Sequence, residues 1–189
     1  MNMTILVTGL LMWWAVHLFP AMAPGTRDNL INKVGLKLYK GYFALFIVIS
    51  IIVIVIGWRS TVPTDIYFPP LWGRHVTYLL VLLTFILFVA AKRKTNIKRV
   101  LRHPQLTGLV LWSIGHLFAN GDNRSLLLFT GLGLWAILEI IMINRRTGAW
   151  VKPVLVPVKS DIITVAGGMI LFSVLFLAHP YLTGIGLIH

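Results

Sequence analysis

Three ionisable side chains lie inside otherwise apolar stretches of this chain: His17, His116 and Glu139. Hydrocarbon is a costly environment for such groups, so inside a membrane they mark candidate functional positions. Two imidazoles from different helices, held at similar depth, can bind a haem iron from its two faces. A buried carboxylate can accept a hydrogen bond from a ligating imidazole and orient it. These residue types predict a haem site with His17 and His116 as the metal ligands.

The same residues also have structural explanations, which their spacing leaves open. A single histidine in a membrane span commonly hydrogen-bonds to a neighbouring helix and stabilises the bundle. Glu139 is close enough to the end of its span for the carboxylate to reach the interface. Arg102 and His103 form a basic turn before a proline, at the mouth of the same region. His103 therefore suits the start of a helix as well as a ligand.

The composition places these residues in a membrane protein. The chain has 189 residues, of which 58% are hydrophobic, and only five are acidic. The mean hydropathy is +0.86, and a soluble domain of this length would need far more polar surface. We expect an all-α polytopic bundle forming a single domain over residues 1–189. The absence of cysteine excludes disulfides and thiolate ligands.

The net charge of +12 would suggest nucleic acid in a soluble protein. Here the basic residues flank apolar spans, which indicates a lipid bilayer with anionic headgroups as the partner and no nucleic acid.

Hydrophobic runs predict about six membrane-spanning helices. The expected spans are residues 3–22, 42–58, 75–91, 106–119, 125–143 and 162–178. The first has no basic leader and no small-residue cleavage site, so we interpret it as a retained span. Residues 29–40 alternate apolar and basic side chains, which predicts a short helix lying on the membrane surface, with a plain basic loop as the alternative.

The loops divide the basic residues unequally. Fourteen of the 17 lysines and arginines fall in the loops after spans one, three and five. The positive-inside rule places these loops in the cytoplasm and both termini outside it. At ~1.5 Å per residue, His17, His116 and Glu139 then lie ~9, ~15 and ~6 Å from the cytoplasmic ends of their spans. We therefore expect all three in one pocket, with Arg102 and His103 at its mouth.

Three blocks of the sequence resemble the NnrU family: HLFPAMAPGTRDNLINKVGLKLYKGYFAL, RHPQLTGLVLWSIGHLFANGDNRSLLLF and the ending AHPYLTGIGL. The likeness extends over nearly the whole chain. It implies a multi-pass protein of the bacterial inner (plasma) membrane, linked to denitrification and to nitrite and nitric oxide metabolism. Denitrification enzymes become expected partners, and whether the protein is itself an enzyme stays open.

NnrU proteins are in turn similar to zeta-carotene isomerase, a haem b enzyme. Following the motifs, the two ligand histidines of that enzyme correspond to His17 in VHLFP and His116 in WSIGHL. The likeness implies haem b as cofactor, and we add Glu139, Arg102 and His103 as cofactor-binding candidates. The chain departs at Ser113, where the isomerase is expected to have a cysteine involved in ligand exchange. This departure argues against the isomerase's redox switch, and with it carotene isomerisation.

Two other interpretations compete. The RHPxxxG pattern resembles membrane methyltransferases that bind S-adenosylmethionine, although Leu106 replaces their aromatic residue and the segment 144–159 has no acid. A non-enzymatic factor that supports denitrification enzymes without a cofactor is the alternative of another class. The triplet Asn120-Gly121-Asp122 suits a turn and helix N-cap better than an outer binding site.

Overall fold

The computed structural model describes residues 3–187. Their regular secondary structure is helical, and the one β feature among them is an isolated bridge between Asp65 and Asp122. The elements are α1 (Met3–Met22), α2 (Pro24–Val34), α3 (Leu36–Ser60), α4 (Gly73–Lys92), the 3-10 helix η1 (Asn96–Arg99), α5 (Pro104–Ala119), α6 (Asn123–Thr147) and α7 (Val158–Thr183). The expected all-α membrane bundle is confirmed.

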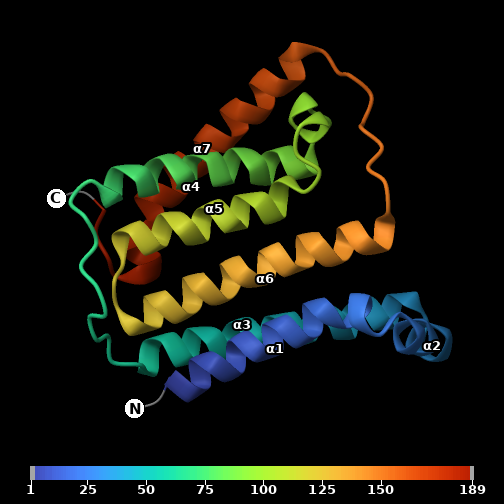
Figure 1. Cartoon of the computed structure of the whole chain (residues 1–189), viewed down its shortest axis with the longest axis horizontal. Coiled ribbons are helices and arrows are strands. Elements are labelled where there is room, and N and C mark those ends of the chain that lie inside the picture. The colour runs from blue at the N-terminus through green and yellow to red at the C-terminus, as the bar shows by residue number, and fades with distance from the viewer. Residues whose placement is uncertain (1–2, 188–189) are drawn as a thin grey trace.

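The long helices pack side by side in the order α7, α4, α5, α6, α1, α3, so α3 and α7 form the two ends of the series (Figure 1). Five of them are long and apolar enough to cross a membrane. The sixth, α5, has only 16 residues, about 24 Å of helix. It lies between α4 and α6 and runs antiparallel to both, so the chain passes along the bundle six times, as the sequence predicts.

The surface helix lies earlier in the chain than expected. We expected it over residues 29–40, but α2 begins at Pro24 and ends at Val34. Gly35 follows with φ of 81°, a backbone conformation that glycine adopts readily, and α3 starts directly after it at Leu36. The basic segment is therefore shared between α2 and the first turns of α3, a division that apolar spacing alone does not reveal.

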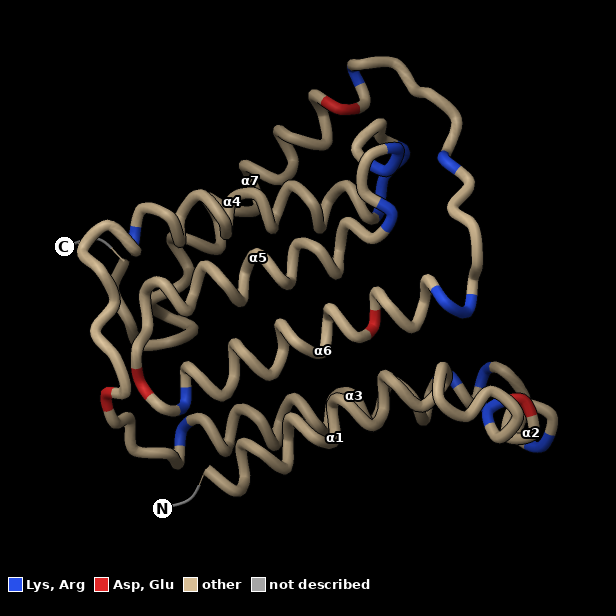
Figure 2. Tube along the Cα trace, viewed as in Figure 1, with Lys and Arg blue, Asp and Glu red and all other residues tan. Residues whose placement is uncertain are grey.

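The two ends of the bundle differ in charge, and most lysines and arginines lie at the end that carries α2 and η1 (Figure 2). At this end Asp161 of α7 holds η1 in place. Its carboxylate accepts hydrogen bonds from the Thr95 hydroxyl at 2.5 Å and from the Asn96 main-chain and amide nitrogens at 2.8 and 2.6 Å. Asn96 also bonds both ways with Val156. This network fixes the loop after α6 against η1.

At the opposite end, the triplet Asn120-Gly121-Asp122 forms a turn, and the Asp122 carboxylate accepts two main-chain N–H groups as the N-cap of α6. This confirms the structural interpretation of the triplet. Tyr67 of the α3–α4 loop donates to the carbonyl oxygens of Leu117 and Asn120. Burial, and next the Asp122 carboxylate, raises the pKa of Tyr67, so its hydroxyl stays a donor.

Small and hydroxylated residues bring the helices close together. A Cβ added at Gly57 of α3 would lie 2.6 Å from Cα of Leu6 on α1. Between α4 and α5, Thr77 and Thr84 donate to the carbonyl oxygens of Gly115 and Gly108 at 2.7 and 2.9 Å. Small residues allow such close approach between membrane helices, and hydroxyls that bond across the interface add to it.

The arrangement leads to a topology prediction. We expect reporter fusions after Lys94 to score cytoplasmic and fusions at the carboxyl end to score outside, because basic loops remain on the cytoplasmic side. Alkaline phosphatase and green fluorescent protein fusions give opposite readouts for the two sides and control for each other. A carboxyl end that scores cytoplasmic would contradict a chain that crosses the membrane six times.

Candidate functional site

His17 lies near the carboxyl end of α1 in an aromatic environment. Its ring centroid is 4.1 Å from that of Trp13 and 4.7 Å from that of Trp135 on α6. Its Nδ1 lies 2.9 Å from the main-chain oxygen of Trp13. A carbonyl oxygen only accepts, so Nδ1 carries the proton, and in the neutral ring Nε2 presents a lone pair.

His116 on α5 repeats this local arrangement. Its Nδ1 lies 2.8 Å from the main-chain oxygen of Trp112, one turn earlier. Its ring packs at 4.5 Å from Trp112 and 4.6 Å from Phe129 of α6. The carbonyl again fixes the tautomer, so both histidines present Nε2 as a potential metal ligand. This Nδ1–H···O=C bond is a common way in which proteins orient a ligating imidazole.

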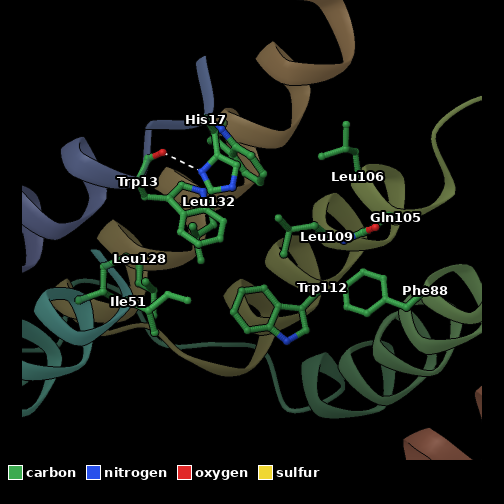
Figure 3. A pocket seen from close by; sticks show the side chains of 12 residues that line it. Trp13, His17, Ile51, Phe88, Gln105, Leu106, Leu109, Trp112, Leu128 and Leu132 are labelled. Carbon is green, nitrogen blue, oxygen red and sulfur yellow. Dashed lines mark hydrogen bonds between the residues drawn. The ribbon is translucent and has the colours of Figure 1, made fainter. Parts of the chain in front are cut away.

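A cavity of about 420 Å³ lies in the middle of the bundle, and Figure 3 shows His17 and Trp112 on opposite sides of it. Its lining residues come from five helices and are almost all apolar or aromatic: Trp13, His17, Ile51, Ile54, Phe88, Gln105, Leu106, Leu109, Trp112, Leu128, Leu132 and Trp135. The indole nitrogens of Trp13 and Trp135 are buried and lack a hydrogen-bond partner within the described residues. Volume and lining suit a large, flat, mostly apolar ligand.

A second cavity of about 520 Å³ adjoins the first at the basic end of the bundle and shares His17 and Trp135 with it. Four of the five predicted site residues line this second cavity: His17, Glu139, Arg102 and His103. Glu139 lies one turn beyond Trp135 on α6, and its Oε2 is buried without a hydrogen-bond partner among residues 3–187. The structure therefore brings these four residues together around a cavity that is more polar than the adjoining central cavity.

Arg102 and His103 also join the start of α5 to the end of α6. The Arg102 guanidinium donates to the main-chain oxygen of Gly148 at 2.9 Å and to the Thr147 hydroxyl at 2.6 Å. Nε2 of His103 lies 2.9 Å from the side-chain oxygen of Asn144. A cation that bonds the last carbonyls of a helix stabilises that end of the helix. The basic turn thus has a structural role in addition to lining the cavity.

His116 lies apart from the other four predicted site residues. It lines a small cavity of about 100 Å³ with Tyr78 of α4 and His179 of α7. His179 is only partly exposed. Trp112 lines both this cavity and the central one and packs on the His116 ring. The indole of Trp112 therefore separates His116 from the cavity that His17 borders.

The comparison with known proteins bears on the whole chain. A family model described as NnrU protein matches residues 5–187. The chain belongs to the NnrU family. The match includes every crossing of the bundle except the first residues of α1, and it includes both histidines of the candidate site. Neither the search of curated proteins nor the search of solved structures gives a match.

In this NnrU protein, sequence reasoning missed two residues of the second cavity. Lys98 of η1 and Gln105 of α5 line it with the predicted residues. Lys98 lies in a basic run whose members were all assigned to the membrane surface, so no signal singled it out. Gln105 is a polar residue at the second position of a helix, a place where polar residues are common for structural reasons.

Proposed function

We propose that this NnrU protein binds haem b within its helical bundle, with His17 as one iron ligand and His116 as the other, and that it acts in nitrite and nitric oxide metabolism at the bacterial plasma membrane. The main support for the proposal is that the two histidines make the same main-chain hydrogen bond. Each has Nδ1 bonded to a main-chain oxygen one turn earlier, which leaves Nε2 available for a metal.

The surroundings of His17 support this proposal. The central cavity offers aromatic walls for the faces of a porphyrin, and two buried indole N–H groups without partners offer donors to its edge. Lys98, Arg102 and His103 line the adjoining cavity, where they would meet the haem propionates. A carboxylate finds charge-assisted hydrogen bonds with such groups. Glu139, the one acid there, would have to be protonated or hydrogen-bonded beside them.

The position of Trp112 sets a condition on the proposal. Ligation by both histidines requires the Trp112 indole to leave the space between them, since it lines the cavities on both sides. Trp112 lies one turn before His116 on the same helix, so a change of its side-chain rotamer is the smallest movement that would suffice. Ser113, at the position where the isomerase is expected to have a cysteine, is buried and packs against Gly133 of α6.

When bound, haem would supply an iron able to bind a diatomic gas. The residues of the chain have separate tasks around it. His17 and His116 would hold the metal through imidazoles whose orientation the main-chain oxygens of Trp13 and Trp112 set. Trp13 and Trp135 pack on His17 and exclude water from that side of the cavity.

One observation favours the alternative of a non-enzymatic membrane factor without a cofactor. Both histidines are already in close aromatic contact, His17 with two tryptophans and His116 with Trp112 and Phe129. Such packing stabilises a bundle without any ligand. In that case the protein would support denitrification enzymes through its surface.

The two functions differ in one measurement. We expect the protein, produced in cells supplied with a haem precursor and purified in mild detergent, to show a Soret band with the α and β bands of low-spin haem. A pyridine haemochrome assay then gives the haem type and the ratio of haem to protein. Protein that is folded and monodisperse but free of haem under these conditions would reject the cofactor and leave the non-enzymatic role.

A further inference from the structure

A fourth cavity, of about 500 Å³, lies beside α2 and shares no lining residue with the cavities of the candidate site. It is bounded by α1, α2 and the start of α3, and its lining has almost no polar surface. The lining residues are Ala15, Val16, Phe19, Leu30, Val34, Tyr39, Tyr42, Phe43 and Phe46. None of the five candidate haem residues is among them. A concave apolar site of this size is large enough for part of a lipid-like ligand.

The polar features of this cavity gather at one place. The hydroxyl of Tyr39 is buried and has no hydrogen-bond partner within the described residues. A buried hydroxyl without a partner is costly, so it calls for an acceptor from outside the chain. The Arg27 guanidinium lies 5.9 Å from the centre of the Tyr39 ring. A donor and a positive charge thus meet beside an otherwise apolar space.

More positive charge lies along the same segment. Lys33, Lys37 and Lys40 are exposed, and Lys33 and Lys40 directly adjoin the lining residues Val34 and Tyr39. The one acid between Pro24 and Lys40 is Asp28, which pairs with Arg27 at 2.8 Å. The rim is therefore strongly cationic, at the end of the bundle where Figure 2 shows most of the basic residues.

We propose that this cavity binds one anionic phospholipid, with an acyl chain in the apolar space and the phosphate at the lysine-rich rim. The cavity lining matches a hydrocarbon chain, the Tyr39 hydroxyl provides a donor to an ester or phosphate oxygen, and the three lysines select negative charge. The site would tie α2 to α1 and α3 through a shared lipid. It does not depend on haem binding.

Native mass spectrometry of the full-length protein tests the site. We expect one phosphatidylglycerol to stay bound under conditions that remove phosphatidylcholine with the same acyl chains. A lysine close to a membrane surface contributes enough electrostatic attraction that the variant K33Q/K37Q should bind phosphatidylglycerol about 30-fold more weakly. The matched control K92Q/K94Q removes two exposed lysines elsewhere at the same end and should bind as the wild type does.

Two further variants and one control distinguish binding of the acyl chain from binding of the headgroup. Ala15→Phe fills the cavity and should abolish the retained lipid, whereas Ile170→Phe adds bulk at an exposed position of α7 and should not. Tyr39→Phe keeps the shape of the lining and should weaken retention without changing the fold. Equal retention in A15F and I170F, or displacement of the lipid by glycerol phosphate that lacks acyl chains, would overturn the proposal.

Discussion

Replacing His17 with alanine is expected to abolish haem binding by the purified protein. His17 is the histidine that borders the central cavity, and its Nε2 would be the atom that binds the iron of a porphyrin placed there. Removing only a hydrogen-bond partner of a metal ligand commonly lowers affinity 10- to 100-fold, so loss of the ligand itself should lower it by at least about 100-fold. The Soret absorbance per mole of protein measures the result.

The same experiment with His116→Ala gives a different expected spectrum. Without its second imidazole the iron should lose its low-spin bands, while the contacts around His17 still hold part of the haem. His75→Ala is the matched control, since His75 is exposed at the start of α4 and lines none of the cavities described here. If H116A keeps the low-spin spectrum of the wild type, His116 is not a ligand.

The sequence predicted the spans well because two independent signals agreed. The length of the apolar runs gave the positions of the helices, and the distribution of basic residues among the loops gave the alternating direction of successive helices. The first span was expected over residues 3–22, the bounds that α1 has. Helix α5 is shorter than a typical membrane span. The polar turns on both sides of it, and the alternation of basic and less basic loops, still identified it from the sequence.

The position of His116 relative to His17 was harder to predict. Counting residues along the predicted spans placed both histidines in the cytoplasmic half of the bundle. In the structure α5 starts at Pro104, so His116 is its thirteenth residue, close to its carboxyl end. At ~1.5 Å per residue His116 lies ~18 Å from the start of α5, whereas His17 lies ~8 Å from the end of α1. Both of these helix ends are at the basic end of the bundle (Figure 2). The side-chain position of Trp112, which depends on packing between helices, has no signature in the sequence at all.

Sequence reasoning was more successful with groups that occupy one end of the bundle. Arg102, His103 and Glu139 lie close together because the loop before α5 and the last turns of α6 are both at the basic end of the bundle, as an antiparallel helix pair requires. Such neighbourhoods follow from topology, whereas contacts in the middle of the bundle depend on helix rotation and on relative depth. The sequence predicted one pocket for all five residues, but in the structure four of them line one cavity and His116 lines another.

The close contact between α1 and α3 leads to the second large prediction. Gly57→Ala should destabilise the protein, because the added Cβ would lie 2.6 Å from Cα of Leu6 and even closer to its nitrogen, and neither backbone atom can turn away. Forcing extra atoms into a packed interface costs about 1–3 kcal/mol, which corresponds to a fall of roughly 5 °C in the apparent melting temperature. Thermal unfolding in detergent, followed by tryptophan fluorescence, measures the effect.

Gly41→Ala is the matched control for this prediction. Gly41 lies on the same helix, and a Cβ added there would meet no atom within 4 Å. Alanine also favours the helix over glycine by up to about 1 kcal/mol, so G41A should leave the melting temperature unchanged or raise it. Ile51 and Ile54 line the central cavity from α3, so separation of α3 from α1 should also reduce haem content in G57A and not in G41A. Equal stability of G57A and G41A would mean that α1 and α3 do not pack as closely as the structure has them.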